Sequence, residues 1–294
     1  MKIFVSLMVG LFLLASLSLS LDESAMLLQE EALERSFIAF GLAKGLNAII
    51  SLLQGTQLYL TPVGIGINIS IGEVLDPFND LVERFSWVML LATVSLGVQK
   101  LLLVLSTKLF LAILLFTSGI VLVSSMWIEK IQNQKVLFYA GKVFMFLLLL
   151  RFGAIVFVYS SQMLYSSVLQ DDYENATVVI GKTQQELENL EEKRTTLLQE
   201  QKSSGFFESI SAKYESVVEK LNISQELENM QASIEISSKK IVSLITIFIV
   251  QSLIFPFLYL LIMYASFKYI FNIGFNSEKI KLLYNGQKLS KERV

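Results

Sequence analysis

Residues 171–240 read DDYENATVVIGKTQQELENLEEKRTTLLQEQKSSGFFESISAKYESVVEKLNISQELENMQASIEISSKK, and they interrupt a chain that is otherwise strongly apolar. The stretch carries 14 acidic and 8 basic residues and no proline. Two long apolar segments, 143–169 and 241–271, flank it. A helix needs about 20 apolar residues to cross a bilayer core of roughly 30 Å. The pattern therefore indicates an integral membrane protein with one sizeable extramembrane helical module.

Within this stretch, one set of side chains recurs at spacings of three and four residues. The first series is Ile180, Thr183, Leu187, Leu190, Arg194 and Leu197. The second is Phe207, Ile210, Tyr214, Val217 and Leu221, resumed after a phase break at Leu227, Met230 and Ile234. Such spacing is typical of a coiled-coil seam, and the turn signal at 202–205 separates the two series. We predict an antiparallel, coiled-coil-like helical hairpin at 171–240, whose arms either pack only on each other or also dock a partner.

Composition supports the membrane class. Hydrophobic residues make up 53% of the 294 residues and charged residues 17%, and the mean hydropathy is +0.59. A soluble domain usually carries about 25% charged residues. The predicted fold is an all-α polytopic membrane protein with five or six spans, the extramembrane hairpin and one short β-strand near 63–71.

The expected order along the chain starts at 1–21 with an uncleaved signal anchor that forms the first transmembrane helix; the alternative for this segment is a cleaved signal peptide. Residues 22–84 are expected to form an amphipathic helix, the short strand and an Asp-Pro helix start. Transmembrane helices are predicted at 85–105, 109–128 and 143–169, followed by the hairpin at 171–240, a last transmembrane helix at 241–271 and a basic tail at 272–294.

Two short motifs decide the interpretation of residues 22–84. Between 63 and 71, valine and isoleucine alternate with glycine, asparagine and serine, as in a half-buried strand. An isolated strand needs a partner, which hints at oligomerisation.

Asp76 precedes Pro77, and aspartate at an N-cap accepts a backbone N–H while proline at the next position has none to donate. We therefore predict Asp76 as the N-cap of the helix that contains the span 85–105.

A polar stripe crosses the apolar segment 37–53. Lys44, Asn47, Ser51 and Gln54 are spaced by three, four and three residues, which places them on one side of a helix. Such a helix lies in the membrane interface, or crosses the membrane with its stripe toward other helices. The alternative is a stripe that lines an aqueous path.

Arg151 is the single charged residue of the apolar segment 143–169. A charge deep in a bilayer costs roughly 3 kcal/mol or more unless it is paired or reaches water. We predict an intramembrane ion pair between Arg151 and an acidic residue near the start of the Pro77 helix, with Asp80 or Glu83 as the partner. The alternative is a gating or pathway role for Arg151.

Histidine and cysteine are absent from the chain. Their absence excludes Ser-His-Asp and Cys-His catalysis, histidine-ligated zinc or haem, and disulfides. No catalytic constellation is recognisable, so we predict no enzyme, no catalytic, cofactor-binding or metal-binding residues, and no cofactor. The chain also lacks the dense basic face that nucleic-acid binding requires.

Basic residues suggest the orientation. The loop 129–142 and the tail from Lys268 onward together carry nine lysines and arginines, and such residues favour the cytoplasmic side. With Lys2 also cytoplasmic, six spans place the hairpin outside the cytoplasm. Five spans, with 37–53 on the membrane surface, place it inside.

Residues 72–86, GEVLDPFNDLVERFS, resemble a stretch found in uncharacterised inner-membrane proteins of Gram-negative bacteria, and the resemblance extends over residues 40–105. It implies a multi-pass location in the bacterial inner membrane and brings no activity, cofactor or site. We expect the lipid bilayer as surroundings, and a protein partner or a second copy bound through 171–240. The expected function is that of a membrane scaffold, adaptor or regulator. The alternative is a small channel or transporter subunit with Arg151 in an aqueous pathway.

Overall fold

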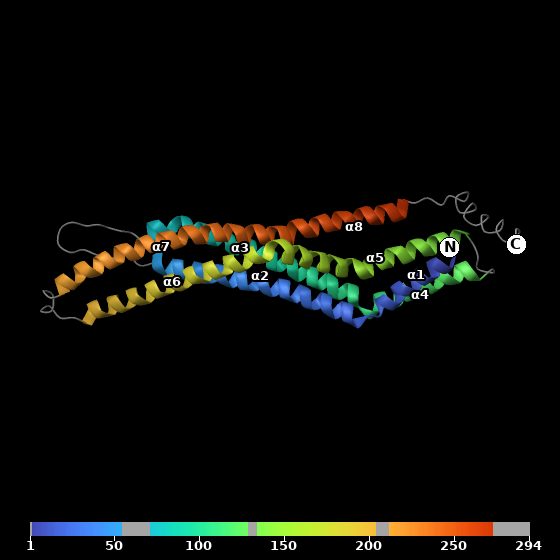
Figure 1. The fold of residues 1–294 in the computed structure, drawn as a ribbon, viewed down its shortest axis with the longest axis horizontal. Coiled ribbons are helices and arrows are strands. Elements are labelled where there is room, and N and C mark those ends of the chain that lie inside the picture. Colours follow the sequence, from blue (N-terminus) through green and yellow to red (C-terminus); the bar gives the residue numbers. More distant parts are fainter. Residues whose placement is uncertain (1, 55–70, 129–133, 204–211, 273–294) are drawn as a thin grey trace. The chain divides into compact units, whose positions relative to one another are not determined.

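The computed structural model describes residues 2–54, 71–128, 134–203 and 212–272 (Figure 1). Almost all of these residues are helical, and none of them is in a strand. The elements are α1 (Lys2–Ser16), α2 (Leu19–Gln54), α3 (Ile71–Thr107), α4 (Leu109–Trp127), α5 (Gln134–Leu164), the π-helical turn η1 (Tyr165–Leu169), α6 (Gln170–Ser203), α7 (Ala212–Ile249), the π-helical turn η2 (Val250–Ile254) and α8 (Phe255–Asn272). The strand predicted near 63–71 falls outside the described residues except for Ile71, which begins α3.

Within the described part of the chain, five helical segments are long and apolar enough to cross a membrane, which indicates a multi-pass membrane protein by helix length and composition. They are Leu19–Gln54, Leu75–Thr107, Leu109–Trp127, Lys135–Glu192 and Asn229–Asn272. The predicted spans 85–105 and 109–128 fall on α3 and α4. The predicted spans 143–169 and 241–271 are parts of longer helical stretches that also include α6 and α7.

The single helix predicted at 1–21 is not formed, because the apolar run is divided at Leu17 and Ser18. Their amides bond to carbonyls three residues back, at 3.2 and 3.1 Å, which tightens the last turn of α1 and ends it. The resulting α1 has 15 residues, fewer than the roughly 17 to 25 that a transmembrane helix requires.

The helices assemble into two compact units. Unit 1 consists of Met1–Glu31, Gly97–Met163 and Ile254–Val294, and unit 2 consists of Ala32–Leu96 and Leu164–Leu253. Each unit has its own hydrophobic core.

In unit 2, parts of α2, α3, α6 and α7 share one core. Its buried members include Leu46 and Ile50 of α2, Phe78 and Phe85 of α3, Ile180 and Leu187 of α6, and Ile234 and Ile241 of α7. Gly45 of α2 lies against the Gln184 side chain of α6, since a Cβ at this position would lie 2.7 Å from Nε2 of Gln184. The α6–α7 pair therefore packs on α2 and α3 as well as on itself.

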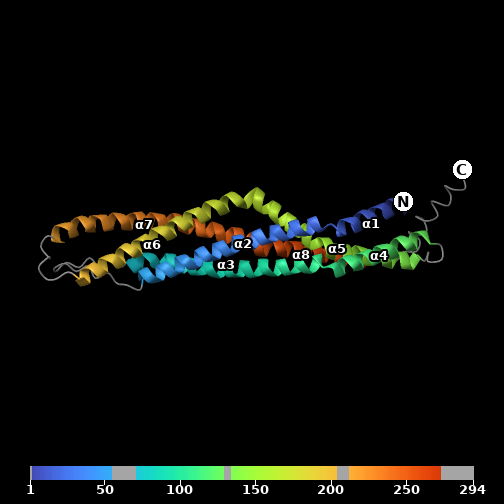
Figure 2. The same ribbon diagram turned by 90° about the horizontal axis from the view of Figure 1, so that it is seen from below.

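α6 and α7 lie side by side in both views (Figures 1 and 2). The predicted seam positions whose side chains are described are buried or half-buried: Ile180, Thr183, Leu187, Leu190, Met230 and Ile234. Between the helices, the Thr183 and Ser237 hydroxyls are hydrogen-bonded at 2.6 Å. A paired polar layer inside an apolar seam favours one register, since any shift leaves a buried hydroxyl unpaired. Residues 204–211, on which half of the turn predicted at 202–205 falls, and the side chains around them lie outside the described part of the chain.

In unit 1, α1 packs beside α4 (Figures 1 and 2). The contact is close at Gly119, where a Cβ would lie 3.0 Å from Cδ1 of Leu13. The outer faces of the helices carry large apolar side chains, among them Ile3, Phe4, Leu7, Leu11, Phe110, Ile113, Phe257, Leu260 and Ile262. Apolar side chains all around a unit are expected of helices that face lipid.

One end of unit 1 gathers four helix ends. The Lys2 amine, at the start of α1, donates to the Met126 carbonyl at the end of α4, at 3.0 Å. The Lys142 amine, near the start of α5, donates to the Phe271 carbonyl at the end of α8, at 2.9 Å. The start of α1, the end of α4, the start of α5 and the end of α8 therefore lie together.

Candidate functional site

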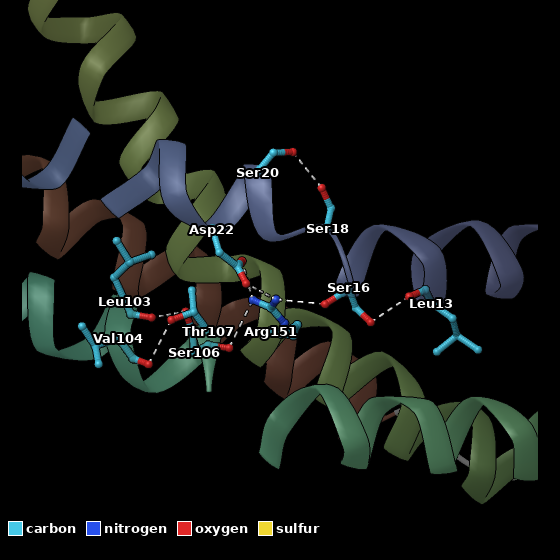
Figure 3. Close-up of polar contacts among 10 residues, drawn as sticks. All are labelled: Leu13, Ser16, Ser18, Ser20, Asp22, Leu103, Val104, Ser106, Thr107 and Arg151. Atoms are coloured by element: carbon cyan, nitrogen blue, oxygen red, sulfur yellow. Dashed lines mark hydrogen bonds and ion pairs between the residues drawn. The ribbon is translucent and has the colours of Figure 1, made fainter. Parts of the chain in front are cut away.

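Two helix breaks meet inside unit 1 (Figure 3). The first separates α1 from α2 at Leu17 and Ser18. The second separates α3 from α4 at Lys108, whose backbone is extended, with φ −62° and ψ 137°. A helix end leaves carbonyl groups without intrahelical donors, so both breaks need hydrogen-bond partners from elsewhere in the fold.

Arg151 of α5 supplies these partners. Its side chain is 2% exposed. Nη2 donates to the Ser16 carbonyl at 3.0 Å and Nη1 to the Ser106 carbonyl at 3.3 Å, so one guanidinium bonds to the last turns of both α1 and α3. The same two nitrogens bind both carboxylate oxygens of Asp22, at 2.9 and 2.6 Å (Figure 3). Arg151 thus connects four segments of the chain.

The charges suit the helix ends at which they lie. Asp22 is in the first turn of α2, where the helix dipole favours a negative charge. The guanidinium lies against the C-terminal carbonyls of α1 and α3, where the dipole favours a positive charge. The planar fork of arginine matches a carboxylate with two parallel bonds, which an ammonium group cannot do. The buried guanidinium charge is therefore compensated by the ion pair with Asp22, by hydrogen bonds to two carbonyls and by the dipoles of three helix ends.

This geometry joins helices and offers little for chemistry on a ligand. The two terminal nitrogens of Arg151 make four contacts. Nε is buried and has no hydrogen-bond partner among the described residues. The terminal nitrogens are engaged by the protein itself, and through them Arg151 links the two helix breaks. Among the described residues, no group of three acidic side chains is placed to hold a metal ion.

The partner of Arg151 differs from the predicted one. Asp80 and Glu83 are exposed on the part of α3 that belongs to unit 2, and the carboxylate that contacts Arg151 is Asp22. The reason is the break at residues 17 and 18, which starts a new helix at Leu19 and places Asp22 in its first turn.

Asp76 is also placed differently from the prediction. α3 begins at Ile71, so Asp76 and Pro77 lie inside the helix and Asp76 is not its N-cap. Pro77 is the seventh residue of α3 and lacks the amide that would bond to the carbonyl four residues back, so the helix loses one hydrogen bond at that position. The Asp76 carboxylate instead accepts a hydrogen bond from Nε2 of Gln54 at 2.7 Å, which links the end of α2 to the start of α3.

The polar stripe of α2 faces away from the core of unit 2. Lys44 and Ser51 are exposed, and Asn47 and Gln54 are half-buried. The opposite side of the helix is buried through Ala43, Leu46, Ile50 and Leu53. Among the described residues of unit 2, the stripe therefore lies on the side of α2 opposite the buried core.

A second cation lies in unit 2 beside the π-helical turn η1. The Arg35 guanidinium lies 3.8 Å from the centre of the Tyr165 ring. Tyr165 meets Tyr173 edge to face at 6.1 Å between ring centres, and the Tyr173 hydroxyl donates to the Arg35 carbonyl at 3.2 Å. Cation–π contacts of this kind stabilise a partly buried arginine. The sequence offered one signal for the cluster, a tyrosine pair eight positions apart around a polar boundary.

No protein-family model, no curated protein and no solved structure matches this chain. Its function is therefore inferred from its own residues and contacts, and from the resemblance at residues 72–86.

Proposed function

We propose that this chain is a multi-pass scaffold of the bacterial inner membrane that binds a protein partner, or a second copy of itself, through an extramembrane coiled-coil-like hairpin built from α6 and α7. The observation that carries the proposal is the contrast between the two faces of α6. Its inner face is apolar and buried at Tyr173, Ala176, Ile180 and Leu187. Its outer face carries charged side chains that are exposed and lie outside the core.

The outer face of α6 is predominantly acidic. Exposed acidic residues are Asp171, Asp172, Glu174, Glu186, Glu188 and Glu192, against the exposed base Lys182 among the side chains described up to residue 192. Acidic surfaces steer encounters with basic partners and repel acidic ones. The proposed partner therefore presents a basic surface to the outer face of α6.

Unit 1 supports an orientation for the hairpin. α5 starts and α8 ends at the end of unit 1 that carries Lys2 and Lys142. The helix ends that lead into α6 and α7 are therefore the ends remote from these lysines. Since lysines favour the cytoplasmic side, the hairpin is proposed to lie outside the cytoplasm.

Cysteine labelling tests this orientation. The chain has no cysteine of its own, and Gln185 and Asn272 are both exposed. Gln185→Cys is expected to react with a membrane-impermeant maleimide in intact spheroplasts. Asn272→Cys is expected to react only after permeabilisation. If only Asn272→Cys is labelled in intact spheroplasts, the orientation is the opposite of the proposed one.

Photo-crosslinking tests the scaffold. A benzophenone amino acid at Gln185, on the outer face of α6, is expected to give an adduct heavier than one chain in the cells that make the protein. The same group at Ile180, which is fully buried, is the matched control and should give none. The charge reversals Glu186→Lys and Glu192→Lys together should reduce the Gln185 adduct several-fold, because they remove the acidic face.

Co-expression of two differently tagged copies distinguishes a second copy of this chain from another protein as the crosslinked partner. An adduct containing both tags identifies a second copy of this chain, and an adduct with one tag identifies another protein. If Gln185 gives no adduct, or if the charge reversals leave it unchanged, the scaffold proposal fails at this surface.

The channel alternative has less support from the geometry. Arg151 is buried and its terminal nitrogens are engaged by Asp22 and two carbonyls. The stripe from Lys44 to Gln54 faces outward from unit 2. Neither feature provides a polar lining for a path.

A further inference from the structure

The end of unit 1 at which four helix ends meet is strongly basic. It carries Lys2 on α1, Lys135 and Lys142 on α5, and Lys268 on α8, and these residues are called the basic end below. The described acidic residues of unit 1, Asp22, Glu23, Glu30 and Glu31, are all on α2. Among the described residues, α1, α5 and α8 therefore carry lysines, and α1, α4, α5 and α8 carry no acidic side chain.

Aromatic side chains surround these lysines. Trp127, Tyr139 and Phe271 are 56%, 59% and 56% exposed. The Trp127 indole N–H donates to the Ser6 hydroxyl at 3.1 Å, and the Lys142 amine lies 4.7 Å from the centre of the Phe138 ring. Exposed tryptophan and tyrosine with one polar and one apolar side are typical of the headgroup level of a membrane.

The lysines of α5 share one face of the helix. Lys135 and Lys142 are seven residues apart, which is two helical turns. The same side of α5 continues to Phe146, whose ring contacts Phe267 and Phe271 of α8 at 5.1 and 5.7 Å between centres. Lys268 follows Phe267 on α8. The edge between α5 and α8 therefore presents ammonium groups beside aromatic rings, directly adjoining the apolar outer surface.

We propose that the basic end binds the phosphate headgroups of anionic phospholipids in the leaflet it faces, with their acyl chains along the apolar surface of α5 and α8. The charge complementarity is direct, since ammonium groups attract phosphate and the neighbouring apolar surface accepts the lipid tails. A zwitterionic lipid offers the same tails without net charge. The site should therefore distinguish lipids by headgroup charge.

Tryptophan quenching provides the test, because the chain has only Trp87 and Trp127. Trp87→Phe leaves Trp127 at the basic end as the sole indole. In phosphatidylcholine bilayers, the Trp127 fluorescence is expected to be quenched more by a small fraction of brominated phosphatidylglycerol than by the same fraction of brominated phosphatidylcholine, with an apparent enrichment of about twofold or more. High salt should reduce the difference, because it screens exposed charges.

Matched variants locate the effect. Lys135→Gln, Lys142→Gln and Lys268→Gln combined should abolish the preference for brominated phosphatidylglycerol. Lys182→Gln, Lys239→Gln and Lys240→Gln on α6 and α7 remove the same charge elsewhere and should leave it unchanged. Circular dichroism melting checks that both triple variants are folded. Equal quenching of the parent by the two lipids at low salt, or a preference that survives loss of the three basic-end lysines, would overturn the proposal.

Discussion

Arg151→Leu is expected to lower the free energy of unfolding by about 3 kcal/mol, because it leaves a largely buried carboxylate without its partner. This is the low end of the roughly 3–5 kcal/mol that breaking a buried ion pair costs, since the Asp22 side chain retains 15% exposure. The substitution also removes the donors to the Ser16 and Ser106 carbonyls. Thermal melting in detergent, followed by circular dichroism, measures the loss.

The double variant Arg151→Leu with Asp22→Asn should recover part of this loss, because it no longer buries an unpaired charge. Arg151→Lys should be intermediate, since an ammonium cannot reproduce the two parallel bonds to Asp22. Lys100→Gln is the matched control. It removes an ion pair of 3.1 Å with Glu30 whose side chains are 31% and 64% exposed, and such a surface pair contributes about 1 kcal/mol or less.

If Arg151→Leu melts together with Lys100→Gln and with the parent, the ion pair does not hold the helix breaks together. If Arg151→Leu is destabilised and the double variant is more so, Asp22 stabilises the fold independently of Arg151.

Leu187→Asp should be at least as damaging, with an expected loss of about 3–5 kcal/mol. Leu187 is fully buried in the core that α6 shares with α2, α3 and α7. Replacing it removes a large apolar side chain, which costs about 2–5 kcal/mol, and adds a carboxylate that has no partner in that core. Chemical denaturation of the full-length protein in detergent, followed by loss of helical signal, measures the effect.

Two matched substitutions accompany this test. Leu190→Asp lies one turn further along α6 at a half-buried position and should cost less than Leu187→Asp. Glu186→Ala changes the exposed neighbour of Leu187 and should alter the free energy of unfolding by at most about 0.5 kcal/mol. A similar loss for all three variants would mean that Leu187 does not occupy a packed core.

Periodicity predicted the helical parts of this chain well where one face is apolar and the other polar. The buried series at Ile180, Thr183 and Leu187 follows from spacings of three and four. The packing of this face on α2 and α3 did not follow, since a helix pattern reports that a face is buried but not what covers it. Gly45, which makes room for Gln184, has no distinctive sequence context.

The Arg151 site illustrates a second limit. The cost of burying a guanidinium indicates that a partner is needed, but its identity depends on where α1 ends. That end results from local bonding by Leu17 and Ser18 within an apolar run that resembles one continuous span. Asp22 and Arg151 are also 129 positions apart, so no local pattern connects them. The Asp76-Pro77 dipeptide predicts an N-cap at Asp76, whereas the helix starts at Ile71.

The separation of Asp22 from Arg151 also has a consequence for biosynthesis. Translation proceeds at about 5–20 residues per second, so the 129 positions between the two residues take on the order of 10 s to synthesise. During that interval the nascent chain contains α1, α2, α3 and α4 without the guanidinium that bonds to two of their broken ends. The first four helices therefore cannot reach their final arrangement while they emerge from the ribosome. Assembly of unit 1 can therefore be completed only after α5 is made.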